Sequence, residues 1–278
     1  MTRLCVPTLK TWLRLFLLER ALSPSSAKAY ATAVNSFLKW SGQGTTVQQA
    51  ADSLSGFVAW RIATGSPYTT FFYRRALLTI LRQAEDRGLC VIPRKVRGVR
   101  LPALQPKGFS DAEIRMLLCF ADPWQRAAIL LVRCAAPRRG DVFRVRWSQV
   151  SPTGVLRFIM NKPGERHAVQ LWPEVIAACE AIRCPGDERL ISWPTTMSNW
   201  HKRWERLGRR AGVDVNGRGL QAIRRTTSSL VAKEKGDYAA AKLLGHSPAS
   251  GVLVFQKFYR VGEIVDEIAP QPPPLEFP

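Results

Sequence analysis

The proline-bearing segment at residues 88–107 constrains the fold more than any other feature of this chain. Pro93, Pro102 and Pro106 prevent a continuous helix from crossing it, because proline lacks an amide hydrogen and its ring clashes with the preceding turn. Five basic residues interrupt the apolar residues of the same stretch. We therefore predict an extended, basic linker that separates two domains. The expected parts of the chain are residues 1–87, 88–107, 108–262 and 263–278.

Helix signals fill the first part of the chain. Ser23 and Ser66 are capping residues, and each is followed by a proline at the first helical position. Apolar residues then recur on one helical face, and the earlier stretch TWLRLFLLERAL is amphipathic. We expect the first domain to be a compact bundle of about four helices.

The second part begins with a capping box, in which Ser110 precedes Glu113 by three residues. Asp122 and its following proline open another helix. Residues 154–171 change to two short extended runs around a KPGE turn, which is the pattern of a β-hairpin. Helices return from Trp172 onward. The predicted fold class is mainly α with a small β-hairpin (α+β).

The charge of the chain points to a polyanionic partner. The formal net charge is +20 and the pI is about 10.5. Residues 1–104 alone contain 15 Lys and Arg against 4 Asp and Glu. Nucleic acid is the leading candidate. An anionic membrane is a weaker one, because the arginines are spread over the whole chain and no apolar run is long enough to span a bilayer.

The six cysteines form no CxxC pair, so zinc binding and redox chemistry are not expected. Cys119 and Cys134 fall in apolar helical runs and are predicted to be buried thiols. The first residues contain no long apolar segment of the kind found in secretory signals. A reducing, cytoplasmic setting is therefore expected, where the protein would be associated with the nucleoid.

Four basic residues and one tyrosine form the chemical signal of the second domain: Arg138, Lys162, Arg224, His246 and Tyr259. Such a set suits a phosphodiester. Arginine holds phosphate oxygens through a bidentate fork and stays charged, whereas lysine can donate a proton to a leaving oxygen. A tyrosine oxygen can attack the phosphorus and form a covalent intermediate.

The order and spacing of these residues resemble the tyrosine recombinase (phage integrase) family over nearly the whole chain. Arg138 is followed by Asp141 and then by Val-Arg-Trp, as in the first box of that family. Lys162 stands on the turn of the expected hairpin, Arg224 closes a Gln-Ala-Ile-Arg box, and His246 ends a Leu-Gly-His triplet. The stretch ALSPSSAKAYATAVNSFLKW resembles the helical core-binding (SAM-like) domain of the same family.

Two positions depart from the family pattern. Gln221 stands where the second box usually has histidine, and glutamine can donate a hydrogen bond but cannot carry a proton. The usual position of the nucleophile, nine residues after the Leu-Gly-His histidine, is occupied by Phe255. Tyr259 is the only tyrosine beyond His246 and lies four residues further on, close to one helical turn.

The resemblance implies a site-specific recombinase or integrase that cuts and rejoins double-stranded DNA through a 3′-phosphotyrosyl intermediate. It implies that the reaction needs neither ATP nor a metal ion, and it allows a role for accessory DNA-bending proteins. Strand exchange would occur in a homotetramer through a Holliday junction, with residues 263–278 docking into a neighbouring protomer. The alternative is a catalytically degenerate DNA-binding relative with an architectural or regulatory role. The length and the helical first domain argue against a type IB topoisomerase or a telomere resolvase.

The resemblance also assigns roles outside the nucleophile. The expected catalytic residues are Arg138, Lys162, Gln221, Arg224, His246 and Tyr259, with Asp141 orienting Arg138 or a neighbouring side chain. Expected DNA contacts are basic residues of the first domain and of the linker: Lys28, Arg74, Arg75, Arg94, Lys95, Arg97 and Arg100. Trp193, Trp200 and Trp204 recur at helical spacing and are expected in the core. His167 and His201 belong to none of these motifs.

Overall fold

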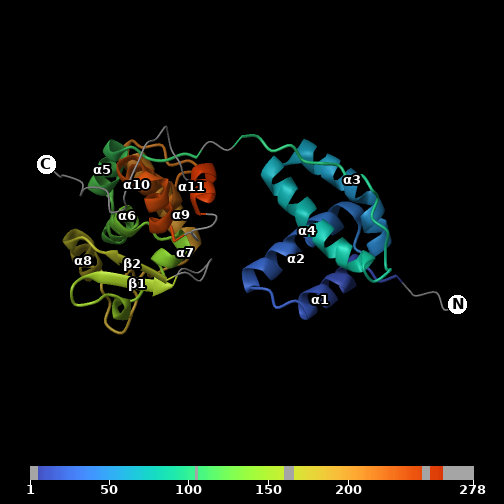
Figure 1. The fold of residues 1–278 in the computed structure, drawn as a ribbon, viewed down its shortest axis with the longest axis horizontal. Helices are drawn as coiled ribbons and strands as arrows, with labels where there is room; N and C mark the ends of the chain where they lie inside the picture. The colour runs from blue at the N-terminus through green and yellow to red at the C-terminus, as the bar shows by residue number, and fades with distance from the viewer. Residues whose placement is uncertain (1–5, 104–105, 160–165, 246–250, 259–278) are drawn as a thin grey trace. The chain divides into compact units, whose positions relative to one another are not determined.

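The structure is a computed structural model that describes residues 6–103, 106–159, 166–245 and 251–258. The chain divides into two compact units, an N-terminal unit of residues 1–103 and a C-terminal unit of residues 104–278. Figure 1 shows the helices of each unit and the two-stranded hairpin of the second. The predicted α+β class is confirmed, since the described part is helical apart from one antiparallel pair of strands.

The N-terminal unit is a four-helix bundle, as predicted. Its helices are α1 (Leu9–Glu19), α2 (Pro24–Ser41), α3 (Val47–Thr64) and α4 (Pro67–Glu85). The side chain of Ser23 accepts a hydrogen bond from the third amide of α2, so the predicted cap is present. Phe37 and Phe57 meet edge to face in the core, with ring centroids 5.0 Å apart. The Nε1–H of Trp12 donates to the carbonyl of Ile80 at 3.0 Å and ties α1 to α4.

The segment after α4 is extended and packs on the helices of its own unit (Figure 1). We call residues 89–102 the basic strap. Leu89, Ile92, Val96 and Val99 of the strap pack against the hydrophobic core. Because these apolar side chains alternate with the basic ones, the strap keeps the basic ones on its outer side.

Side chains of α3 and α4 hold the backbone of the strap. Ser55 accepts a hydrogen bond from the amide of Arg97 at 3.1 Å. Arg74 donates to the carbonyls of Arg97 at 2.7 Å and Val96 at 3.4 Å. The hydroxyl of Tyr68 donates to the carbonyl of Pro102 at 2.8 Å.

The C-terminal unit is built around one central helix, α6 (Pro123–Ala135). The helices that surround or follow it are α5 (Asp111–Phe120), α7 (Arg139–Val142), α8 (Pro173–Glu180), α9 (Met197–Ala211), α10 (Leu220–Leu243) and α11 (Gly251–Phe258). A short 3₁₀ helix, η1, covers Trp147–Gln149. The helix α10 is kinked at Gly236, whose φ of 80° is in the region that favours glycine.

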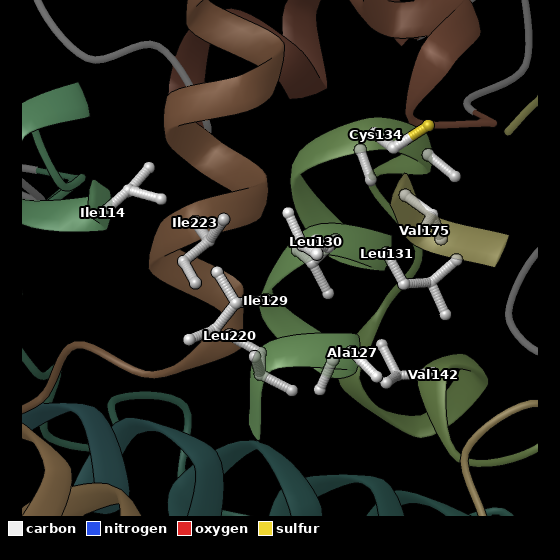
Figure 2. Close-up of a cluster of buried hydrophobic side chains, with 14 of the residues drawn as sticks. Ile114, Ala127, Ile129, Leu130, Leu131, Cys134, Val142, Val175, Leu220 and Ile223 are labelled. Atoms are coloured by element: carbon white, nitrogen blue, oxygen red, sulfur yellow. The ribbon is translucent and has the colours of Figure 1, made fainter. Parts of the chain in front are cut away.

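Apolar side chains surround α6 on more than one side. Figure 2 shows Ile129 of α6 beside Leu220 and Ile223 of α10, while Leu131 lies toward Val175 of α8. Residues 127–135 of α6 are all buried, including Arg133. This central position fixes where the C-terminal end of α6 lies within the unit.

The predicted hairpin is present as β1 (Val155–Ile159) paired antiparallel with β2 (Arg166–Gln170). In this register Phe158 is the partner of His167. The predicted capping box at Ser110 also forms, and Asp122 begins a helix as predicted, with a capping box of its own.

The three tryptophans at helical spacing are buried, as predicted. Trp200 meets Trp193 edge to face at 4.9 Å and stacks on Trp204 at 6.1 Å. Cys134 is buried, but the prediction for Cys119 was wrong, because this residue is exposed. The inward face of α5 carries Ile114, Leu117 and Leu118, so position 119 falls outside it. Within the described ranges, no helix is long and apolar enough to cross a membrane.

Candidate active site

The candidate site forms where α6 ends. Ala136 follows the helix with φ 45° and ψ 39°, a left-handed conformation that a non-glycine residue adopts rarely. Arg138 stands two residues further on as the N-cap of α7, and its side chain is half-buried. The tight turn at Ala136 therefore brings Arg138 back to the end of the central helix.

The last carbonyl groups of an α-helix have no partners within the helix. Side chains from β2 and α10 supply the partners here. The hydroxyl of Thr227 lies 3.4 Å from the carbonyl oxygens of Val132 and Arg133. His167 forms a hydrogen bond with the backbone of Ala135. The end of α6 is thus a junction of α6, β2 and α10.

Arg224 is the main member of this junction. Its side chain is fully buried, and its guanidinium donates to the carbonyl of Ala136 and, at 2.9 Å, to the carbonyl of Leu244. A buried charge is tolerated only when hydrogen-bonded groups surround it. Arg224 therefore links the turn before Arg138 to the end of α10, two residues before His246 in the sequence.

His167 lies beside both arginines. Burial lowers the pKa of its imidazole to about 4, and the nearby guanidiniums of Arg224 and Arg138 act in the same direction. The hydrogen bond to Ala135 opposes this shift only in part. Within the described residues, Arg138 and Arg224 are thus both near enough to His167 for their charges to lower its pKa. Sequence reasoning had assigned His167 no role. The usable signal was the alternation of His167, Val169 and Leu171, which marks the inward face of β2.

Gln221 is placed differently from Arg224, although it is one helical turn earlier on α10. It is half-buried and lines a cleft of about 910 Å³ together with Arg139, His201 and Trp204. Nη1 of Arg139 and Nε2 of His201 are 3.1 Å apart. The cleft lies within the C-terminal unit and is lined by Arg139, not by the predicted Arg138.

Asp141 is buried in α7, and its amide donates to the carbonyl of Arg138 at 2.8 Å. Its expected orienting role stays a prediction. The predicted Lys162, His246 and Tyr259 lie outside the described residues. Phe255, at the usual position of the nucleophile, is fully buried in the core of the C-terminal unit.

Most of the predicted DNA-contacting residues are exposed on the N-terminal unit: Lys28, Arg75, Arg94, Lys95, Arg97 and Arg100. Arg74 is half-buried instead, and its guanidinium is engaged by the strap carbonyls described above. A further basic surface, on α9, was not predicted from the sequence, where the spacing of Trp200 and Trp204 indicates only the buried face of this helix. Its exposed basic residues are His201, Lys202, Arg206, Arg209 and Arg210.

Comparison with known proteins gives the class of fold. Residues 9–84 match the family model of the phage integrase N-terminal SAM-like domain. A lambda integrase tetramer bound to a Holliday junction is similar in structure with a TM-score of 0.76 and 19% identity, over 94% of this chain and 80% of that one. No curated protein sequence matches the chain.

Other recombinase structures agree. The Tn1549 transposon integrase in complex with a circular intermediate DNA matches with a TM-score of 0.68 and 12% identity, over 91% of this chain and 95% of that one. The XerH site-specific recombinase bound to its difH substrate matches with a TM-score of 0.62 and 17% identity, over 85% and 82%. The chain therefore has the fold of the tyrosine recombinases, and its first domain is of the phage integrase SAM-like type. The resemblance predicted from the motifs is confirmed at this level.

Proposed function

We propose that this chain is a site-specific DNA recombinase that cuts and rejoins double-stranded DNA through a 3′-phosphotyrosyl intermediate. The nearness of Arg138 and Arg224 to the neutral imidazole of His167 at the end of α6 carries the proposal, because two guanidiniums in one region favour the binding of an anion. In a chain of net charge +20, a phosphodiester is the anion that suits such a site. The similar structures bound to DNA support this choice.

In the proposed reaction the hydroxyl oxygen of Tyr259 attacks the scissile phosphorus. The bond from phosphorus to the 5′ oxygen breaks, and Lys162 donates a proton to that leaving oxygen. Arg138 and Arg224 stabilise the charge on the non-bridging oxygens, with hydrogen bonds from His246 and Gln221. The phosphotyrosyl bond retains the energy of the broken bond. A 5′ hydroxyl of a second strand can therefore rejoin the DNA without ATP or a metal ion.

The placement of α11 supports delivery of Tyr259 to the arginines of the same chain. Phe255 anchors α11 in the core, and Nε2 of the Gln256 side chain donates to the carboxylate of Asp237 on α10 at 2.6 Å. Four residues of an α-helix correspond to about 400° of rotation, so a helix continued from α11 would carry position 259 on the same face as Phe255. The four extra residues after His246 would in that case keep the nucleophile on the face that packs in the core of the unit.

DNA binding would use the exposed basic residues of the strap and of α9 on their respective units. Each phosphate contact releases counterions, so the affinity should fall steeply as salt rises. Strand exchange in a homotetramer, with residues 263–278 docked on a neighbour, completes the proposal.

A non-catalytic DNA-binding relative is the second candidate. Two observations favour it: Gln221 stands in place of an imidazole, and a buried phenylalanine occupies the usual position of the nucleophile. Such a protein would bind DNA with the same sensitivity to salt and would form no covalent bond with it.

A covalent-trapping experiment separates the two candidates. The full chain first selects its binding site from a random duplex pool, and the selected site is then rebuilt with a nick that lets the cleaved 5′ end diffuse away. Wild-type protein should form an adduct that resists denaturation, and Tyr259→Phe should abolish it. Tyr238→Phe is the matched control, since Tyr238 is an exposed tyrosine of α10, and it should leave the adduct unchanged. Tight binding without any adduct would favour the second candidate.

A further inference from the structure

His167 is held firmly in place but, within the part of the chain that the structure describes, uses only part of its hydrogen-bonding capacity. The residue is 8% exposed and packs edge to face on its strand partner Phe158, with ring centroids 5.3 Å apart. Its Nε2 is buried and has no hydrogen-bond partner among the described residues. The bond to the backbone of Ala135 must therefore come from Nδ1.

This arrangement fixes the tautomer. A neutral imidazole that donates from Nδ1 to a carbonyl carries a lone pair on Nε2. A buried polar atom without a partner is costly, and natural proteins retain few of them. Here the atom belongs to a side chain that lies beside two guanidiniums. The free lone pair on Nε2 points to a hydrogen-bonding partner that the bound ligand supplies.

We propose that His167 supplies the imidazole of the phosphate site and that it takes up a proton when a phosphodiester binds beside Arg138 and Arg224. The inference rests on the proposed function, because it assumes that this junction binds the scissile phosphate. The proton comes from the solvent and is held on Nε2, which then donates a hydrogen bond to a non-bridging oxygen. His167 in this way provides the ionisable group that Gln221 cannot provide.

The charges around the imidazole give the direction of the effect. Arg224 faces it from α10 and Arg138 from the turn before α7, and both oppose protonation in the free chain. With its pKa at about 4, His167 is then neutral at pH 7. A bound anion offsets the two positive charges, so its field must raise the pKa of His167.

Nuclear magnetic resonance of histidine labelled at Cε1 can test the proposal on the full chain, which contains only three histidines. Sulfate is the probe, because it is tetrahedral like phosphate and does not titrate in the range used. Replacing chloride by sulfate at equal ionic strength should raise the pKa of His167 by at least about 1, because sulfate carries two negative charges and even one charge several ångströms away in a partly screened site has about this effect. At pH 5 the protonated fraction would rise from about one tenth to about one half.

Arg138→Gln should raise the pKa of His167 in chloride, because it removes a cation, and should abolish the further rise with sulfate. The proposal would be overturned if sulfate left the pKa of His167 unchanged. The sulfate concentration must reach values that saturate binding elsewhere on the chain.

Two substitutions separate this role from a purely structural one. Asparagine places its amide near the position of Nδ1, so His167→Asn keeps the bond to Ala135 and loses the group at Nε2. Glutamine places its amide near Nε2, so His167→Gln retains a donor there and loses the bond to Ala135. The proposal expects His167→Asn to keep the unfolding temperature and to lose at least tenfold in the rate of adduct formation. His167→Gln should retain more of this rate per folded molecule.

Wild-type adduct formation in His167→Asn would show that the histidine only caps Ala135. The proposed function can fail separately. If sulfate raised the pKa of His167 but the wild type formed no adduct, the phosphate site would be supported and the DNA-cutting reaction would be refuted.

Discussion

The burial of Arg224 gives the sharpest test of the junction at the end of α6. We consider Arg224→Met, which keeps much of the side-chain volume and removes the guanidinium. The substitution deletes the hydrogen bonds to the carbonyls of Ala136 and Leu244 and leaves both groups in a buried setting. It also removes one positive charge from the surroundings of His167 and Arg138.

The magnitude follows from these contacts. Hydrogen bonds from a charged donor contribute about 1.5–3 kcal/mol each, and unpartnered buried carbonyls cost a similar amount. The relief of a buried charge offsets part of this loss. We therefore expect the free energy of unfolding of the C-terminal unit to fall by about 3–5 kcal/mol, a large part of the stability of an ordinary domain. Arg225→Met is the matched control: Arg225 is half-buried, and its loss should cost less than about 1 kcal/mol.

Hydrogen exchange measured by mass spectrometry suits this test, because it reports each unit of the same molecule separately. Amides of α6 and α10 should lose protection in Arg224→Met, whereas amides of α2 and α3 should keep it. If Arg224→Met and Arg225→Met lowered the protection of α6 equally, the two carbonyl bonds would not hold the site together, and the reasoning would be refuted.

Three further predictions concern other parts of the chain. Arg74→Met should release the backbone of the basic strap, seen as faster hydrogen exchange there, while Arg75→Met leaves exchange unchanged and lowers only DNA affinity. Burial raises the pKa of Cys134 to about 12, so iodoacetamide at pH 8 should modify the exposed Cys119 and spare Cys134, as read by peptide mass spectrometry. The pKa of His167 is lower in the folded chain, at about 4, than the ordinary value of about 6.5, so the unfolded chain binds more protons between about pH 4 and about pH 6.5. The free energy of unfolding should therefore fall as the pH drops from about 6.5 to about 4. In urea unfolding, His167→Gln should lack this part of the pH dependence.

The sequence predicted those features that depend on a few neighbouring residues. The caps at Ser23, Ser110 and Asp122 are local patterns, and the helices that they open are present. The hairpin was likewise predicted from two extended runs and a turn. The docking of the basic strap was not, since it depends on Ser55, Arg74 and other side chains far away in the sequence.

The same distinction applies to the site. Arg138 and Arg224 were predicted from motif spacing, their catalytic roles stay predictions, and the charges of both lower the pKa of His167. The alternation of His167, Val169 and Leu171 marks the inward face of β2, but no local pattern encodes the meeting of this strand with α6 and α10. The assignment of Arg138 in preference to Arg139 was a choice of register. Each has a distinct place in the structure, since Arg139 lines the cleft with Gln221.

The position of Gln221 bears on whether an imidazole was lost or replaced. On α10 it precedes Arg224 by three residues. Gln221 lines the cleft, whereas Arg224 is fully buried and donates a hydrogen bond to the carbonyl of Ala136. Loss of an imidazole at position 221 would cost a catalytic site its ionisable group unless another element supplied one. The hairpin already brings its strand β2 to the end of α6, where His167 bonds to Ala135. If His167 both caps the helix and binds the phosphate as proposed, the substitution at position 221 is compatible with a catalytic site, and the buried Phe255 becomes the stronger of the two observations that favour a non-catalytic relative.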